Sequence, residues 1–264
     1  MIRLIASDID GTLIKDSTPD LYPEMEEAVR QLAEKGILFC AASGRQYQSI
    51  KNVFRNIEED IVFIAENGAQ VRYRDQDISL TPMKREYAEE IIRQLRGYYR
   101  NCDIVVSTPN GCLLESKNKE FINLITYGYH NKFALVRDVL EEDAEIIKIA
   151  IYQKDSIREL GEEVLIPAWQ DRVKVCMAGE EWVDFMDASV DKGNALSFVQ
   201  NYFGISREET MAFGDNNNDI GMMQAAGESY AVENAREEVR AAAGRVCSGY
   251  LEKGVYQVIK GLLG

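Results

Sequence analysis

The sequence contains a single histidine, His130, and its five cysteines are odd in number and dispersed. A metal site built from several histidines is therefore impossible, and a Ser-His-Asp mechanism has only one candidate base. Because the cysteines show no C-x-x-C spacing, we expect reduced thiols in a cytoplasmic protein rather than a disulfide framework. Catalysis, if present, must depend on carboxylates, lysine and metal ions with oxygen ligands.

Long apolar segments and excess positive charge are also missing. No apolar run approaches the roughly 20 residues of a membrane span, and residues 1–3 lead into a predicted strand rather than a signal peptide. Lysine and arginine number 30 against 44 acidic residues, which gives a formal charge of −14. This charge argues against nucleic acids or an anionic membrane as partners. No feature of the sequence indicates an obligate protein partner.

The composition is that of an ordinary globular protein, with 46% hydrophobic and 28% charged residues over 264 positions. This length suits one large domain or two modest ones. Apolar runs alternate with amphipathic segments in the first part of the chain. Strands are expected over residues 4–7, 37–42 and 61–65, and helices over 23–36 and 46–54. This alternation is typical of a parallel α/β sheet.

The middle of the chain has a different texture, because hairpins are mixed with helices. Helices are expected over residues 84–99, 117–125 and 156–165. The parallel pattern resumes with a helix over 191–204, strands over 210–213 and 229–232, and a last helix. We therefore predict an α/β fold, in which a Rossmann-like parallel-sheet core over 1–82 and 187–264 is split by an inserted α+β domain over 83–186.

Two aspartates, Asp8 and Asp10, end the first expected strand and are followed at once by glycine and threonine. Strand alternation places both on one side at the carboxyl end, where open α/β sheets bind ligands. Two like charges so close together need a positive partner, and a divalent metal is the simplest one. Taken alone, the pair is explained equally well as a polar turn.

Further polar groups follow another strand or begin a helix. Asp215 and Asp219 add carboxylates with no histidine or thiolate nearby, a donor set that suits Mg²⁺. Ser43 is placed where a helix is expected to begin, so it could bind an anion or merely cap that helix. Lys192 also begins a helix, where a cation is unfavourable unless an anion lies within reach; a solvated lysine is the alternative.

Together, these residues resemble the four motifs of the haloacid dehalogenase superfamily of phosphohydrolases. Asp8-Ile9-Asp10-Gly11-Thr12-Leu13 resembles motif I, Ser43-Gly44-Arg45 motif II, Lys192 motif III, and the run from Gly214 to Asp219 motif IV. Glu66-Asn67-Gly68 and Asn234-Ala235 resemble the Cof-type branch, which carries an α+β cap of the C2 type between motifs II and III. Ser43 is a small departure, since this branch more often has threonine there, but the hydroxyl is kept.

The resemblance implies a Mg²⁺-dependent phosphatase that hydrolyses phosphoric monoesters of small metabolites, such as sugar phosphates or phosphorylated cofactors. Asp8 would attack phosphorus and become an aspartyl-phosphate, while Asp10 would act as general acid and then as general base. The metal would be held by the Asp8 carboxylate, the Asp10 backbone carbonyl and the Asp215 carboxylate.

The remaining motif residues would support this reaction. The resemblance implies phosphate binding by backbone N–H groups around Ile9 and Gly44 and by the side chains of Ser43, Lys192 and Asn218. Asp219 would orient metal-bound waters or Lys192 from outside the coordination sphere, with Thr12 as a second supporting residue. Arg45 is left open between a substrate contact and a place on the helix surface.

The inserted domain would close over the substrate, exclude water and select the leaving group, with hinges near Pro82 and Asp187. Candidates for that selection are Tyr127, Tyr129, His130 and Lys148, although a surface or core position is the simpler explanation for each.

Three other functions could use the same residues. A phosphomutase or phosphotransferase would form the same aspartyl-phosphate and pass its phosphoryl group to an acceptor. A receiver-like signalling domain also combines an aspartate, Mg²⁺ and a lysine on a parallel sheet, but the long insert and the second aspartate count against it. Haloalkanoate dehalogenation could use Asp8, but Asp215 would then be superfluous.

Overall fold

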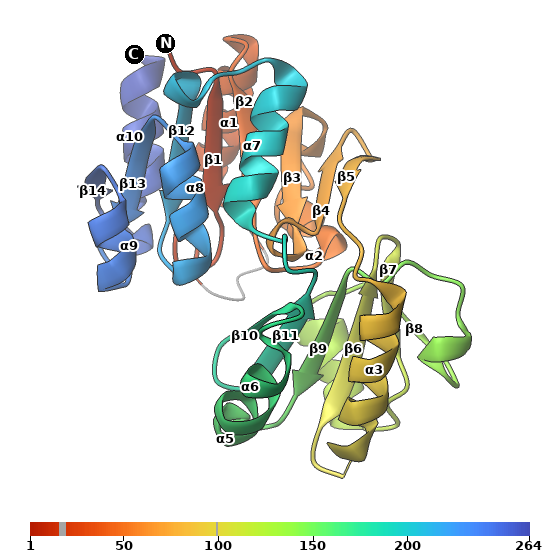
Figure 1. Cartoon of the computed structure of the whole chain (residues 1–264). Helices are drawn as coiled ribbons and strands as arrows, with labels where there is room; N and C mark the ends of the chain where they lie inside the picture. The colour runs from red at the N-terminus through yellow and green to blue at the C-terminus, as the bar shows by residue number, and fades with distance from the viewer. Residues whose placement is uncertain (16–19, 99) are drawn as a thin grey trace. The chain divides into compact units, whose positions relative to one another are not determined.

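The computed structural model describes residues 1–15, 20–98 and 100–264. These form two compact units: a core unit of Met1–Ser79 with Asp191–Gly264, and an inserted unit of Leu80–Val190. In Figure 1 the core unit carries the red-to-orange and blue ends of the colour scale. The expected bounds of 83–186 lie a few residues inside this division, and a side chain of the inserted unit bonds to the segment that leads out of it. Met83 donates its N–H to Ile146 (2.8 Å), and Lys174 Nζ donates to the carbonyl of Val190 (2.7 Å).

The core unit is built on an eight-stranded sheet in the order β14-β13-β12-β1-β2-β3-β4-β5. Its strands are β1 (Leu4–Asp8), β2 (Leu38–Ala42), β3 (Ile61–Ala65), β4 (Gln70–Tyr73), β5 (Gln76–Leu80), β12 (Thr210–Gly214), β13 (Glu228–Val232) and β14 (Arg245–Cys247). β1 is a central strand and runs parallel to both of its neighbours, β2 and β12. The carboxyl ends of these three strands therefore lie at one edge of the sheet.

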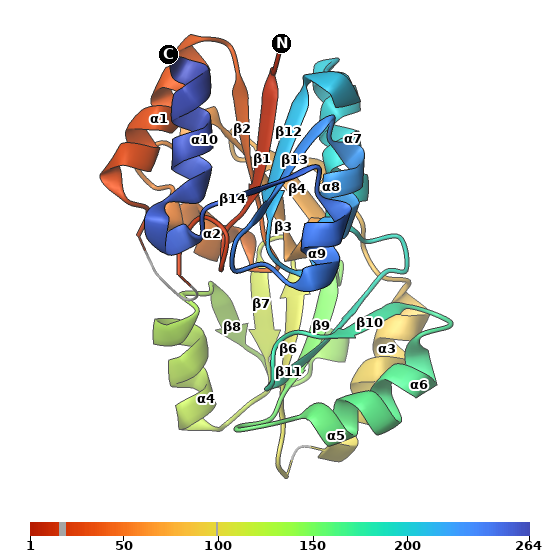
Figure 2. The ribbon, with the colours of Figure 1, turned by 90° about the vertical axis from the view of Figure 1, so that its left-hand side faces the viewer.

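Helices cover both faces of this sheet (Figures 1 and 2). They are α1 (Pro23–Glu34), α2 (Tyr47–Val53), α7 (Lys192–Phe203), α8 (Ile220–Ala225), α9 (Glu237–Ala242) and α10 (Gly254–Leu263). Strand alternation divides the core: Ile5 and Phe39 pack with α1, α2 and α10, whereas Leu4 and Cys40 pack with α7 and α8. Both faces of the strands are thus apolar, as expected for a parallel sheet buried between helices.

The helix that begins at Lys192 has well-defined signals at both ends. The Asp191 side chain caps α7 by accepting the N–H of Gly193 at 2.7 Å, and Gly204 ends the helix with a φ of 62°. This cap fixes the start of α7 and therefore the position of Lys192.

The inserted unit has its own six-stranded sheet in the order β10-β11-β9-β6-β7-β8. The strands are β6 (Asp103–Thr108), β7 (Gly111–Leu114), β8 (Phe133–Leu135), β9 (Lys148–Tyr152), β10 (Lys174–Met177) and β11 (Trp182–Met186), and the helices are α3 (Arg85–Leu95), α4 (Lys119–Asn123), α5 (Arg158–Leu160) and α6 (Ile166–Trp169). α3 and α6 cover one face and α4 the other.

The predicted fold class, an α/β core with an inserted α+β domain, is confirmed, but several helix lengths in the insert were wrong. The helix expected over 84–99 ends at Leu95, and its expected last residue, Tyr99, lies outside the described residues. The other two expected helices are shorter and continue into π-helical turns over 124–128 and 161–165. The strand Phe133–Leu135 was missed, because it is short and pairs with a strand about 20 residues earlier.

Within the described residues, no helix combines the length and the apolar character needed to cross a membrane.

Candidate active site

The last residue of β1, Asp8, forms a buried ion pair with the first residue of α7, Lys192. Lys192 Nζ donates to Asp8 Oδ1 at 2.6 Å and to Asp219 Oδ1 at 2.7 Å, and its side chain is 0% exposed. The expectation of an anion beside Lys192 is thus met by two carboxylates of the chain itself, and the alternative of a solvated lysine is wrong. Residues 184 positions apart meet because the start of α7 reaches the carboxyl edge of the sheet.

Three carboxylates converge at this edge. Asp8, Asp215 and Asp219 each offer an oxygen within 4.8 Å of the others. Burial, reinforced by Asp219, raises the pKa of Asp8 well above its usual value despite the opposing effect of Lys192, and raises the pKa of Asp215 to about 6. The pKa of Lys192 is also raised, because Asp219 and Asp8 outweigh the effect of its burial. Fully ionised, the four groups carry a net charge of −2, so the cluster is suited to a divalent cation.

The carboxylate oxygens of the cluster differ in how many hydrogen bonds they already accept. Asp8 Oδ2 is buried and has no hydrogen-bond partner among the described residues. Asp215 Oδ1 accepts from Thr12 Oγ1 at 3.1 Å. Asp219 is more fully engaged, because its Oδ1 binds Lys192 and its Oδ2 accepts the N–H groups of Asp215 and Asn216, both at 3.0 Å. An all-oxygen donor set with an unpartnered buried carboxylate oxygen fits Mg²⁺, with Asp8 and Asp215 as the better placed ligands.

Asp10 forms a bidentate ion pair with Arg45. Arg45 Nε donates to Asp10 Oδ2 at 2.7 Å, and Arg45 Nη2 donates to Asp10 Oδ1. The Arg45 side chain is only 16% exposed and precedes α2, which begins at Tyr47. The alternative that placed Arg45 on the helix surface is therefore wrong. The guanidinium fixes the orientation of the Asp10 carboxylate, since both of its oxygens are held by one rigid planar group.

Ser43 does not begin a helix, contrary to the sequence-based expectation. The N-terminal cap of α2 is Gln46, and Ser43 continues the line of β2 by donating its N–H to the carbonyl of Ile64 at 2.9 Å. Its Oγ accepts the N–H of Arg45 at 3.1 Å, which shapes the turn that carries Gly44. The capping explanation is therefore wrong. Ser43 is buried beside β3, where its hydroxyl hydrogen can still be donated.

Asn218 contacts Asn67, a residue with no predicted catalytic or binding role. Asn218 Nδ2 donates to Asn67 Oδ1 at 2.9 Å, while Asn218 Oδ1 is buried without a partner in the described part of the chain. Asn67 appeared in the sequence only as part of the Glu66-Asn67-Gly68 signature. An Asn-Gly pair followed by alternating residues predicts a small hairpin, and this pattern assigns no role to the asparagine side chain. Likewise, Asn234 Nδ2 donates to the carbonyl of Gly11 at 2.7 Å and supports the turn after β1.

The four candidates for leaving-group selection all lie in the inserted unit. Tyr127 and His130 are exposed, with Tyr127 at 73%. Tyr129 accepts from Trp182 Nε1 at 3.0 Å, and Lys148 is buried in β9, 3.3 Å from Asp184 Oδ2. Tyr127 and His130 therefore have surface positions, whereas Tyr129 and Lys148 make contacts within the inserted unit.

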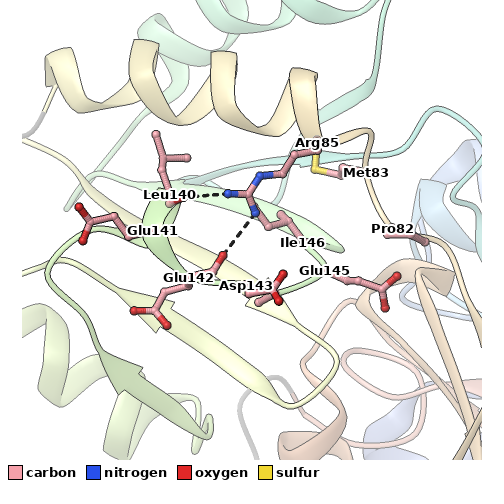
Figure 3. A pocket seen from close by; sticks show the side chains of 10 residues that line it. Pro82, Met83, Arg85, Leu140, Glu141, Glu142, Asp143, Glu145 and Ile146 are labelled. Atoms are coloured by element: carbon pink, nitrogen blue, oxygen red, sulfur yellow. Dashed lines mark hydrogen bonds between the residues drawn. The ribbon is translucent and has the colours of Figure 1, made fainter.

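A cavity of about 620 Å³ also lies in the inserted unit, between the start of α3 and the segment before β9 (Figure 3). Arg85 donates there to the carbonyls of Leu140 (2.9 Å) and Glu142 (3.4 Å). None of the predicted site residues lines this cavity. Four of the lining side chains are acidic, namely Glu141, Glu142, Asp143 and Glu145. Because this cavity contains none of the motif residues, the carboxylate–lysine cluster of the core unit is the better candidate for the active site.

Comparison with known proteins agrees with this geometry. A family model described as haloacid dehalogenase-like hydrolase matches residues 5–259. The chain belongs to this family. As a haloacid dehalogenase-like hydrolase, it has curated relatives that are named phosphatases. It is 28% identical over 262 residues to 5-amino-6-(5-phospho-D-ribitylamino)uracil phosphatase YbjI of Escherichia coli, covering 99% of this chain and 96% of the relative.

Two further matches extend over most of the chain. A phosphoglycolate phosphatase of Methanospirillum hungatei is 27% identical over 240 residues, or 91% of this chain and 88% of the relative. A crystal structure from Eubacterium rectale is 38% identical, with a TM-score of 0.90 and 99% of both chains covered. The predictions of a Cof-type haloacid dehalogenase superfamily member and of a phosphatase are confirmed.

Proposed function

We propose that the chain is a Mg²⁺-dependent phosphomonoester hydrolase that acts on small phosphorylated metabolites through an aspartyl-phosphate on Asp8. The observation that supports this most strongly is the buried cluster in which Lys192 contacts Asp8 and Asp219 beside Asp215. A carboxylate that carries one close ammonium and one unpartnered oxygen is suited to attack an anionic phosphate, because the charge around it can be balanced.

Mg²⁺ would be held by the carboxylates of Asp8 and Asp215 and the backbone carbonyl of Asp10, and when bound it offsets charge on the nucleophile and the phosphate. Lys192 would neutralise phosphoryl oxygens as charge develops on them. Ser43, Asn218 and the backbone N–H groups of Ile9 and Gly44 would hold the same oxygens. Asp219 would orient Lys192, and Thr12 would orient Asp215 through its 3.1 Å hydrogen bond.

Asp10 would protonate the leaving oxygen and then take a proton from the water that hydrolyses the aspartyl-phosphate. Its ion pair with Arg45 suggests how the carboxyl is kept in position between the two steps. Arg45 would then serve as support for Asp10, and not as a residue of the helix surface.

Asp10→Asn is expected to affect poor leaving groups more than good ones. An alkyl phosphate needs its leaving oxygen protonated, so its kcat should fall by about 10²-fold. With p-nitrophenyl phosphate, whose leaving group is a stable anion without protonation, the rate of Asp8 phosphorylation should fall by a smaller factor. Burst-phase kinetics with both substrates provide the measurement. Equal losses of burst rate for the two substrates would contradict a general-acid role.

The inserted unit would act as a cap that selects the leaving group, with the connections near Pro82 and Asp187 as hinges. The two named relatives act on very different substrates, a ribitylaminouracil phosphate and phosphoglycolate. We therefore extend to this chain only the class of small phosphorylated molecules, among them sugar phosphates and phosphorylated cofactors. A cytoplasmic location and the absence of nucleic-acid, membrane or obligate protein partners stay predictions.

The function is tested by measuring inorganic phosphate released from a panel of phosphorylated metabolites, with and without Mg²⁺. Asp8→Asn protein is the blank. We expect Mg²⁺-dependent release from at least one small phosphomonoester with no acceptor added, which would separate a phosphatase from a phosphomutase or phosphotransferase. A long-lived phosphoprotein without turnover would instead support a signalling domain.

Mg²⁺ should also stabilise the protein in the absence of substrate. Because a ligand that binds only the folded state adds RT ln(1 + [L]/Kd), Mg²⁺ at about 100 times its Kd should add about 2.7 kcal/mol to the free energy of unfolding. Thermal unfolding with and without Mg²⁺ measures this shift. Asp215→Asn should reduce it strongly, whereas the exposed Asp171→Asn, in the inserted unit, should keep it. An unchanged shift in Asp215→Asn would remove Asp215 from the metal site.

A further inference from the structure

The turn that follows β3 is strained over three consecutive residues. Glu66, Asn67 and Gly68 have φ values of 48°, 58° and 106°, all in the left-handed region. Such conformations cost of order 1 kcal/mol or more for a residue other than glycine, although asparagine tolerates them better than most. Yet Glu66 and Asn67 are both buried, which means that the surrounding structure holds them in place.

The backbone of this turn contacts two other segments of the active site. Glu66 donates its N–H to the carbonyl of Arg45, and Asn67 donates its N–H to the carbonyl of Ser43, both at 3.0 Å. On the other side, a Cβ on Gly68 would lie 2.7 Å from the carbonyl oxygen of Asp191, the residue that caps the helix of Lys192. Only glycine allows this approach. The turn therefore lies between the Ser43–Arg45 loop and the start of α7.

The side chain of Asn67 contacts two groups that we place around the phosphate. Its Oδ1 accepts from Asn218 Nδ2 at 2.9 Å. A Cβ on Gly44 would lie 3.1 Å from Asn67 Oδ1 and 3.2 Å from its Nδ2, so the carboxamide packs directly against the Gly44 backbone. One buried side chain thus spans from the loop after β2 to the loop after β12.

We propose that Asn67 is a positioning residue for phosphoryl transfer: its carboxamide fixes the amide of Asn218 and the backbone at Gly44 in the geometry that meets the transferring phosphoryl group. This inference rests on the proposed function, since Asn218 and Gly44 matter only if phosphate binds there. Asparagine could also occur at position 67 only because it tolerates a left-handed backbone conformation. The test must therefore distinguish the effect of the backbone conformation from the effect of the side-chain carboxamide.

Asn67→Gly and Asn67→Ala make that separation. Both remove the carboxamide, but only glycine also accepts the φ of 58° without strain. Asn67→Ala should therefore melt a few degrees, about 3 °C, below Asn67→Gly. Both variants should lose kcat by a similar factor of about 10 to 100, which is typical when a supporting hydrogen bond is removed. KM should change by less than about threefold, since the contact acts mainly on charge that develops during transfer.

A double-mutant cycle with Asn218→Ala shows whether Asn67 acts through Asn218. Asn218→Ala should lower kcat, and the loss in the double variant should be clearly smaller than the product of the two single losses, with any loss beyond Asn218→Ala alone due to the backbone at Gly44. Multiplied losses, or wild-type kcat in either single variant, would overturn the proposal. So would an Asn67→Gly protein whose melting temperature falls by more than about 10 °C, because the carboxamide would then be structural.

Two controls keep this test apart from the test of the function itself. The Mg²⁺-dependent rise in melting temperature should persist in Asn67→Gly, because Asp8 and Asp215 are untouched. If Asp8→Asn keeps its activity, the proposed function is wrong. If Asp8→Asn is inactive and Asn67→Gly is fully active, only the role of Asn67 is wrong.

Discussion

Asp8→Asn is expected to abolish phosphate release, with kcat lower by on the order of 10⁴-fold or more. An amide is not nucleophilic toward phosphorus, and Asp8 combines an unpartnered buried oxygen with a close ammonium. The fold should stay intact, because the Asn oxygen can still accept from Lys192. Burial raises the pKa of Asp8, so removing its charge should not lower the melting temperature measured without metal.

The measurement is phosphate release from the best substrate of the panel, together with thermal unfolding of the same samples. A matched control is Asp171→Asn, which changes an exposed aspartate of the inserted unit and should keep wild-type turnover. Near-wild-type turnover of Asp8→Asn in the presence of Mg²⁺ would contradict the assigned nucleophile.

Lys192→Met should have the second largest effect, and it should affect both activity and stability. The methionine keeps the length of the side chain but removes the ammonium that contacts Asp8 and Asp219 at 2.6 and 2.7 Å. kcat should fall by on the order of 10³-fold, as when charge stabilisation of a transition state is removed. Two buried carboxylates lose their counter-charge, so the free energy of unfolding should fall by about 3 kcal/mol without metal.

A second substitution separates these two effects. Lys192→Met combined with Asp219→Asn removes one of the stranded charges, so stability should recover in part while activity stays lost. Lys253→Met is the matched control, because its ammonium pairs with Glu24 near the surface and should matter little to either quantity. If the double variant regained activity together with stability, the lysine would be only structural.

The convergence of Asp8, Lys192 and Asp219 could be predicted because it depends on a regular rule. Parallel strands bring their carboxyl ends to one edge, so residues at strand ends meet there whatever separates them in the sequence. Arg45 was left open because its position depends on a long, flexible side chain. Only the folded chain shows that its guanidinium reaches Asp10.

Ser43 and Asn67 show where sequence patterns were insufficient. Ser43 does not cap the helix that follows it, because its hydroxyl accepts from Arg45 in a turn and the cap of α2 is Gln46. The conformation of Glu66-Asn67-Gly68 depends on packing against Gly44 and Asp191, which lie far away in the sequence. The local sequence predicts only that the Asn-Gly pair forms a turn before a hairpin. The contacts of this turn with Gly44 and Asp191 could not be predicted from it.

The division of the core unit into two sequence segments also determines when the enzyme can form during synthesis. The inserted unit, Leu80–Val190, is continuous and contains all the strands of its own sheet. It can therefore fold while later residues are still being added, since domains generally fold as units as the chain emerges. β1 cannot gain its neighbour β12 until residues 210–214 have been made. Asp8 thus has none of these partners until the segment from Lys192 to Asp219 has been made, and the proposed catalytic centre cannot assemble on the nascent protein before that point.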